Sequence, residues 1–261
     1  MLTIYFSATG NSAYIARKFS EAMGGKCLSI EDKAGFAAEI AGAAAIAFCY
    51  PVYGSRVPLA MRMFAAEHMQ ALKGKQLVIF ATQLIFSGDG ARVFTDLFPK
   101  NHVQVIYAEH FLMPNNVCNL AILRQTGAKR TQKFLRRAER KIQRVRDDIQ
   151  SGRAKLRGFS AVSRVLGSLQ GKAWQGDSRQ VRPGKNTMEH KAMRAVKIHP
   201  QCNACGLCAQ ACPMKNLGQN QGKITHNSNC CVCYRCVNLC PRQAITVLFH
   251  KRPKWQYKGL P

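Results

Sequence analysis

The sequence predicts an α/β protein whose parallel sheet is covered by helices on both faces, followed by a small cysteine-rich domain. Short apolar runs alternate with helically spaced segments through residues 1–127, which is typical of a parallel sheet. Nine of the twelve cysteines fall between Cys202 and Cys240 and need a local explanation. With 47% hydrophobic and 20% charged residues, the chain is expected to be globular.

The elements of the first part follow from the spacing of apolar residues. Strands are expected at residues 2–6, 43–48, 76–81 and 103–107, each bounded by a turn or a polar loop. Two helices are expected before residue 73, at Ala13–Met23 and Pro58–Leu72. The apolar face of the second helix is expected to comprise Leu59, Met63, Ala66 and Met69. A long amphipathic helix over Lys129–Gln150 is expected to bury Leu135, Ala138, Ile142, Val145 and Ile149.

These elements suggest four segments along the chain. Residues 1–150 form the α/β domain, and residues 151–194 form a basic linker with a short helix near Phe159–Leu169. Residues 195–250 form the cysteine-rich domain, and residues 251–261 form a basic tail. No signal peptide and no apolar run long enough to span a bilayer are visible, so a cytoplasmic protein is expected. Disulfides are not expected in that compartment.

The net charge of +26 is unevenly distributed. Residues 1–128 carry +3, residues 129–198 carry +15, and residues 199–261 carry +8 without a single acidic residue. A basic surface of this kind attracts anionic partners. An acidic ferredoxin or flavodoxin, an anionic membrane surface and, less well supported by motifs, nucleic acid all fit, as does a face that only keeps the protein soluble.

The cysteine-rich segment contains the same motif twice. Each copy has the spacing C-x2-C-x2-C-x3-C followed by proline, which is the pattern of bacterial ferredoxins that bind two 4Fe-4S clusters. The spacing places three cysteines of each run on one cluster and the fourth on the other. One cluster would take Cys202, Cys205, Cys208 and Cys240, and the other Cys230, Cys233, Cys236 and Cys212. Two zinc sites are the alternative, but zinc explains neither the third close cysteine nor the proline. Cys231 does not fit the spacing and is expected not to be a ligand.

A hydroxyl-rich loop, Ser7-Ala8-Thr9-Gly10-Asn11-Ser12, joins the first expected strand to the first helix. Backbone N–H groups and the helix N-terminus would face a phosphate there, with Ser7, Thr9 and Ser12 adding hydroxyls. The loop has neither the lysine of a P-loop nor a G-x-G-x-x-G motif, so a monophosphate ligand is favoured. The alternative is a simple helix cap.

This hexamer resembles the FMN phosphate loop of flavodoxins, [ST]-x-T-G-x-[ST]. The resemblance implies that the loops after the third and fourth strands border the flavin. In the first of them, Tyr50, Pro51, Tyr53 and Gly54 are candidates, with Tyr53 preferred over Tyr50 for stacking on the flavin ring. Thr82, Gly88 and Asp89 are candidates in the second loop, where Ser87–Gly90 could equally cap a helix. The asparagines of Met113–Asn116 face the flavin or bond within their own turn, and the turn is preferred.

Taken together, the chain resembles bacterial flavodoxin–ferredoxin fusion proteins. The resemblance implies a flavodoxin-like doubly wound sheet, a C-terminal α+β ferredoxin-type domain, FMN and two 4Fe-4S clusters. An electron-transfer oxidoreductase is therefore expected, and no substrate is identified. A nucleic-acid-binding or membrane-binding protein with structural clusters is the alternative. Cys27, Cys49 and Cys118 are interpreted as core residues, with Cys49 near the flavin as the alternative.

Overall fold

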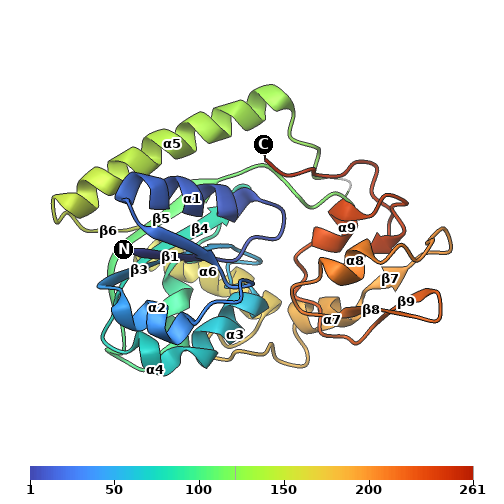
Figure 1. Ribbon diagram of the computed structural model, residues 1–261, viewed down its shortest axis with the longest axis horizontal. Helices are drawn as coiled ribbons and strands as arrows, with labels where there is room; N and C mark the ends of the chain where they lie inside the picture. The colour runs from blue at the N-terminus through green and yellow to red at the C-terminus, as the bar shows by residue number, and fades with distance from the viewer. Residues whose placement is uncertain (121, 261) are drawn as a thin grey trace.

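A six-stranded, entirely parallel sheet organises the first part of the chain (Figure 1). The structure is a computed structural model and describes residues 1–120 and 122–260. The strand order is β2-β1-β3-β4-β5-β6, the doubly wound order of a flavodoxin-like fold with one added edge strand. The strands are β1 (Leu2–Tyr5), β2 (Lys26–Ser29), β3 (Ala45–Pro51), β4 (Gln76–Gln83), β5 (Gln104–Leu112) and β6 (Lys155–Leu156).

Helices cover both faces of the sheet, as predicted (Figure 1). One face carries α1 (Asn11–Met23) and α5 (Ala128–Gln150). The other carries α2 (Phe36–Gly42), α3 (Leu59–Glu67), α4 (Met69–Leu72) and the 3-10 helix η1 (Arg92–Leu97). Because side chains alternate along a strand, β4 turns Phe80 toward Phe19 of α1, with ring centroids 4.7 Å apart, and turns Ile79 to the other layer.

Some expected elements differ in the structure. The helix expected at Pro58–Leu72 is divided at His68 into α3 and α4. Of its predicted apolar face, Leu59 is buried but Ala66 is exposed. Phe64 takes the central place instead, packing edge-on against Phe36 of α2. Two elements were not predicted: α2, and β2, which is short and lies at the sheet edge. For α5 the predicted face is confirmed, with Ile149 only partly buried.

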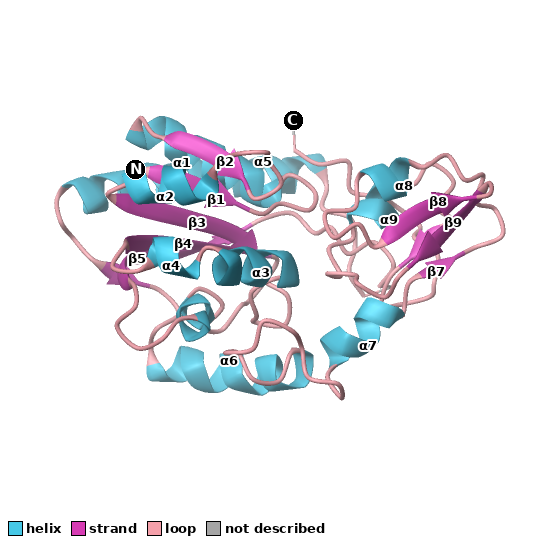
Figure 2. Ribbon diagram, turned by 60° about the horizontal axis from the view of Figure 1, so that its bottom comes forward, coloured by secondary structure: helices cyan, strands magenta, loops and turns pink. Residues whose placement is uncertain are grey.

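Residues 151–194 contain more regular structure than the expected linker. They hold β6, which pairs with β5, then α6 (Ala161–Trp174) and α7 (Met188–Arg194), which lead toward the cysteine-rich part (Figure 2). Gly167 and Gly171 let α6 approach the first domain closely. A Cβ on Gly171 would lie 1.9 Å from Cζ of Arg56, and one on Gly167 would lie 1.9 Å from Oδ1 of Asp89. These contacts explain why glycines occur one helical turn apart in α6.

The cysteine-rich part has its own small core. It contains β7 (Lys197–Ile198), α8 (Leu207–Gln210), β8 (Leu217–Asn220), β9 (Lys223–His226), α9 (Arg235–Leu239) and β10 (Ile245–Thr246). β8 pairs with β9 and β7 with β10, both antiparallel. Of the expected tail, Pro261 lies outside the described residues, and Tyr257 reaches back to the first domain. Within the described residues, every helix is too short or too polar to cross a membrane.

A buried ion pair ties α7 to α3. The Arg62 guanidinium donates to the Glu189 carboxylate at 2.8 Å, and each side chain is only 1% exposed. Arg62 also donates to the backbone carbonyls of Val57 and Val181, at 3.0 and 2.8 Å. The pair thus fixes the segment that leads into the cysteine-rich part against the first domain.

Replacing Glu189 by Ala should lower the free energy of unfolding by about 3–5 kcal/mol, because it leaves a buried guanidinium without its counter-charge. Urea denaturation followed by circular dichroism measures the change. Glu21→Ala breaks the exposed Lys18–Glu21 pair and serves as the control, with a loss below about 1 kcal/mol. Equal losses in the two variants would contradict a stabilising role for the buried pair.

Candidate functional site

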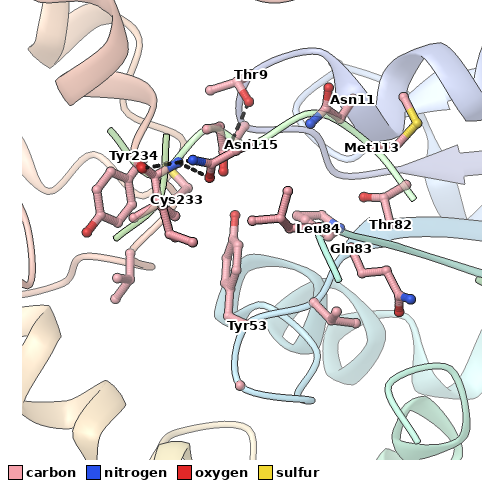
Figure 3. Close-up of a pocket in the computed structure, with 18 of the residues that line it drawn as sticks. Thr9, Asn11, Tyr53, Thr82, Gln83, Leu84, Met113, Asn115, Cys233 and Tyr234 are labelled. Atoms are coloured by element: carbon pink, nitrogen blue, oxygen red, sulfur yellow. Dashed lines mark hydrogen bonds between the residues drawn. The ribbon is translucent and has the colours of Figure 1, made fainter. Parts of the chain in front are cut away.

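A cavity of about 530 Å³ opens at the carboxyl edge of the parallel sheet (Figure 3). The loops after β1, β3, β4 and β5 converge there, as expected for ligand sites in open α/β sheets. Most of the residues predicted to contact a flavin line it: Ser7, Thr9, Asn11, Ser12, Pro51, Tyr53, Gly54 and Thr82. Residues from α6 and from the cysteine-rich part complete the wall.

The loop between β1 and α1 is shaped to receive an anion. Gly10 has a left-handed backbone, with φ of 99°, and precedes a 13-residue helix whose first turn has no side-chain cap. The N–H groups of that turn lack intrahelical acceptors, so they are available to a phosphate. Ser7 Oγ accepts a bond from the Gly10 N–H at 3.2 Å, which closes the turn. Gly10 shapes the loop without lining the cavity.

Side chains from neighbouring loops hold the phosphate loop in place. Asn116 Nδ2 donates to Thr9 Oγ1 at 3.0 Å, which leaves the Thr9 hydroxyl proton for a ligand. Asn11 Nδ2 donates to the Pro114 carbonyl at 2.9 Å. Ser12 Oγ lies 2.7 Å from Thr82 Oγ1, and this hydroxyl pair links α1 to the end of β4. The loop is thus organised before any ligand binds.

Two polar atoms in the cavity wall have no partner. Tyr53 Oη and Gln83 Oε1 are buried and form no hydrogen bond to any described residue. Figure 3 shows the Tyr53 ring standing among the labelled residues with its hydroxyl toward them. Burial raises the pKa of this hydroxyl well above its usual value, so it remains a neutral donor. Unpaired buried polar groups are costly, and a polar planar ligand would satisfy both atoms.

Other residues of the wall were not predicted. Trp174, at the end of α6, packs against Gly54, where a Cβ would lie 2.6 Å from the tryptophan side chain. Gly54 has φ of 56°, so both the backbone and the contact require glycine. The sequence hinted at Trp174 only through its rarity, since the chain has two tryptophans.

Three of the predicted flavin contacts lie elsewhere. Tyr50 is fully buried, stacks on Phe94 at 5.5 Å and donates to the Gly90 carbonyl at 3.0 Å, so it belongs to the core. Asp89 is buried and accepts two bonds from Arg92, at 3.0 and 2.7 Å. Gly88 lies beneath α6, so the loop after β4 leaves the cavity before reaching it. Those three predictions are corrected.

Residues Met113–Asn116 line the cavity, but their amides serve the protein. Asn115 Oδ1 accepts from the Val117 N–H at 2.9 Å, which is the predicted bond within the turn, whereas Asn116 reaches Thr9. Cys49 is buried in the core, and its Sγ donates to the Ser12 carbonyl at 3.3 Å. Its thiol therefore lies behind the loop and outside the cavity.

The eight cysteines of the repeat gather around two smaller cavities. One is lined by Cys202, Cys205, Cys208 and Cys240. The other is lined by Cys212, Cys230, Cys233 and Cys236, with Cys231 beside them. These are the two sets of four that the spacing indicates, including the exchange of the fourth cysteine between the runs.

The two runs have the same backbone geometry. The N–H of Ala204 donates to Cys202 Sγ at 3.4 Å, and in the second run the N–H of Val232 donates to Cys230 Sγ at 3.3 Å. Equivalent bonds reach Cys212 Sγ from Asn216 and Cys240 Sγ from Ala244, at 3.3 and 3.2 Å. N–H donors of this kind stabilise ligating sulfurs.

The cysteines surround cavities and do not converge on a point. Within residues 1–120 and 122–260, no three His, Cys, Asp or Glu side chains converge closely enough to hold a single metal ion. Burial raises the pKa of the Cys230 thiol to about 12, so a thiolate there needs a cationic partner. Four cysteines around each cavity are a donor set compatible with an iron–sulfur cluster.

One wall separates the large cavity from the second cysteine cavity. Cys233 and Tyr234 line both of them. Tyr234 has φ of 64°, at the position that Gly206 occupies in the first run. Non-glycine residues in this conformation are strained, and such strain is concentrated at functional sites. Among the described residues, none lines both the first cysteine cavity and the large cavity.

Comparison with known proteins identifies the first part of the chain. A family model described as a flavodoxin domain matches residues 2–152. Among solved structures, a flavodoxin from Megasphaera elsdenii is 19% identical, covering 54% of this chain and 99% of its own, with a TM-score of 0.38. Trp repressor binding protein from Bacillus subtilis is 16% identical, with coverages of 54% and 96% and a TM-score of 0.39. An archaeal flavodoxin is 15% identical, with coverages of 57% and 97% and a TM-score of 0.35. No curated protein matches the sequence.

A buried histidine, His110, lies against the loop after β4 and should make the stability of the protein depend on pH. Ser87 Oγ lies 3.0 Å from Nδ1 of His110, which is 6% exposed. Burial, followed by the charges of Arg157 and Lys141, lowers the His110 pKa to about 4 against the opposing effect of Glu109. Between about pH 4 and about pH 6.5, His110 therefore binds a proton in the unfolded chain but not in the folded chain.

The wild type should therefore lose about 2 kcal/mol of stability through this residue between pH 7.5 and pH 5. His110→Gln should remove that part of the loss, because glutamine does not titrate. Urea midpoints at the two pH values measure it. A wild-type profile retained by His110→Gln would show that another group is responsible.

Proposed function

The chain belongs to the family of flavodoxin-domain proteins, and on this premise we propose that it is an electron-transfer protein that uses FMN and two 4Fe-4S clusters. A flavodoxin domain followed by two cavities lined by cysteines supports this proposal. The observation that carries the proposal is the shared wall: Cys233, an expected ligand of the second cluster, also lines the cavity beside the phosphate loop.

In this proposal the phosphate of FMN binds at the loop after β1. The first turn of α1 and the hydroxyls of Ser7 and Thr9 would hold it, since Ser12 already pairs with Thr82. Tyr53 and Gln83 would offer their unpartnered atoms to the flavin ring. Tyr53, Phe86 and Trp174 line the cavity, and their aromatic side chains would help to cover the ring and exclude water.

FMN exchanges one or two electrons and each cluster exchanges one, so their combination would convert between one-electron and two-electron chemistry. The fold determines which of the two cysteine cavities borders the large cavity. Cys233 and Tyr234 line both the large cavity and the second cysteine cavity, whereas the described residues that line the first cysteine cavity border neither of them. Electrons would therefore pass between an external carrier and the flavin through the first and then the second cluster.

An acidic one-electron carrier is the proposed external partner. Cys205 is exposed, and Leu207 beside it is 45% exposed, so the first cavity lies near the surface. Arg242 lines the same cavity, and no acidic residue occurs after Glu189. A carrier with an acidic surface would be drawn to this end of the molecule.

Contact with an anionic membrane is a second candidate role, favoured by α6. Val162, Val165 and Leu169 share one side of this helix and are 61–69% exposed. Arg164 and Lys172 belong to the same helix, which is the composition of a helix that lies on an anionic lipid surface. Co-sedimentation with anionic and with neutral vesicles tests this role. Equal binding of the wild type and the Val165→Asp variant to anionic vesicles would contradict it.

The cofactors themselves are tested by anoxic purification. About eight iron atoms, about eight sulfides and one FMN per chain are expected. Flavin without iron would limit the proposal to a flavodoxin, and iron without flavin would limit it to a ferredoxin. Reduced protein should show the electron paramagnetic resonance of two interacting clusters.

Replacing Tyr53 by Leu should raise the dissociation constant for FMN about tenfold, because an aromatic contact and a hydrogen bond are lost together. Quenching of FMN fluorescence measures the affinity. Tyr50→Phe is the control, since Tyr50 lies in the core, and its affinity should match the wild type. Equal affinities in all three proteins would exclude Tyr53 from the flavin site.

Cys233→Ser should reduce the iron content to about four atoms per chain, because one cluster loses a ligand. Cys231→Ser should retain about eight, because Cys231 lies outside the repeated spacing. Iron and sulfide analysis of both variants distinguishes a ligand from a neighbouring thiol. Loss of iron from the Cys231 variant alone would reverse the assignment.

A further inference from the structure

We propose that Arg235 couples the two cofactor sites, so that the second cluster strengthens FMN binding by fixing the phosphate loop. This rests on the proposed function and concerns a positioning residue, whose guanidinium forms no hydrogen bond to a cysteine sulfur in the described part of the chain. Arg235 stands between Cys233 and Cys236 in the second cysteine run and is the first residue of α9.

Every N–H of the Arg235 guanidinium is used. Its Nη2 donates to the Ser7 carbonyl at 2.7 Å, and its Nε donates to the Ala8 carbonyl at 2.9 Å. Both acceptors belong to the phosphate loop. Nη1 donates to the Ala211 carbonyl at 2.9 Å, and the two remaining N–H groups hold the Glu31 carboxylate at 2.6 Å. Five bonds match the five donors of the group.

These bonds connect the loop to the second cysteine set. Arg235 is separated by one residue from Cys233 and adjoins Cys236, while Ala211 immediately precedes Cys212. Three of the four expected ligands of the second cluster are therefore within two residues of an atom of this network. Once iron holds these thiolates, the backbone that carries Arg235 is fixed, and the guanidinium is fixed with it.

The expected effect on FMN affinity follows from the acceptors of the Arg235 hydrogen bonds. Arg235 binds carbonyl oxygens of the loop and leaves the loop's N–H groups to a phosphate. The Glu31 carboxylate, 31% exposed, holds the guanidinium from the side of β2. A guanidinium held by Glu31 and by its own backbone fixes Ser7 and Ala8 in place. The loop is then ordered before FMN binds, so FMN binding loses less conformational entropy.

A second path runs in parallel from the same helix. Asn238 of α9 donates to the Asn116 carbonyl at 2.9 Å, and the Asn116 amide donates to Thr9. Tyr257, whose N–H donates to Asn238 Oδ1 at 2.7 Å, donates its hydroxyl to Asn11 Oδ1 at 2.7 Å. The loop therefore retains contacts with the cysteine-rich part when Arg235 is replaced, and the variant keeps a folded loop.

The experiment measures FMN affinity by fluorescence quenching in the full chain, once with iron and once after removal of iron by a chelator. In the wild type, iron removal should raise the dissociation constant about tenfold. In Arg235→Lys, which cannot form the planar fork, the iron-loaded protein should bind FMN about as weakly as iron-free wild type. Iron removal should then raise the dissociation constant by clearly less than in the wild type, because only the Asn238 and Tyr257 contacts still connect the two sites.

The Arg242→Gln variant is the matched control, because Arg242 also borders a cysteine cavity but makes no hydrogen bond to any described residue of the phosphate loop. It should keep the tenfold dependence on iron. Glu31→Gln, which weakens one anchor and leaves the cysteine run intact, should reduce the dependence without abolishing it. This second variant decides the matter if Arg235→Lys does not fold.

An equal loss of FMN affinity in iron-loaded and iron-free Arg235→Lys would show that the residue only supports the loop, and would overturn the coupling. A wild-type affinity that ignores iron would overturn it as well. Failure of the proposed function looks different, since the wild type would then lack iron or would not bind FMN at all.

Discussion

The carboxyl edge of the parallel sheet is the constraint on which the rest of the structure depends. All six strands run in the same direction, so every loop that follows a strand emerges at this edge. The hydroxyl-rich loop, the Tyr53 loop and the asparagine turn meet there because β1, β3 and β5 end there. The cysteine-rich part packs against the same edge, and it supplies Cys233 and Tyr234 to a cavity that the sheet alone would leave open.

The two duplicated cysteine runs have different surroundings, so the two cysteine sets are not equivalent. In the first run Cys205 is exposed, whereas Cys230, Cys233 and Cys236 of the second run are buried. Position 206 is glycine and its counterpart is Tyr234, although both adopt the left-handed backbone. Glycine is the residue best suited to this turn, but the second run has a tyrosine there, and that tyrosine lines the cavity. The Arg62–Glu189 pair and the Arg235 bonds hold the two parts in this arrangement from different sides.

The errors of the sequence interpretation have physical causes. Tyr50 and Tyr53 are three residues apart in one loop-forming segment, but Tyr50 is still within β3 and its side chain is directed into the core. Gly88 and Asp89 follow β4 by several residues, and α6 covers them through Gly167, a contact between residues almost eighty positions apart. Trp174, Gln83 and Arg235 belong to no motif. Their roles come from what they contact, and spacing along the chain does not encode such contacts.

Residue order by itself determined the parallel sheet, the loop at Ser7–Ser12 and the division of eight cysteines into two sets. These depend on local rules: the period of apolar residues, the steric freedom of glycine, and the short reach of a C-x2-C-x2-C turn. Only the tertiary structure decided which cysteine set borders the large cavity and which tyrosine enters it. It also decided that one arginine, which lies in sequence near three cysteines, forms hydrogen bonds to the phosphate loop. Such pairings join residues more than two hundred positions apart, and packing free energy summed over the whole fold selects them.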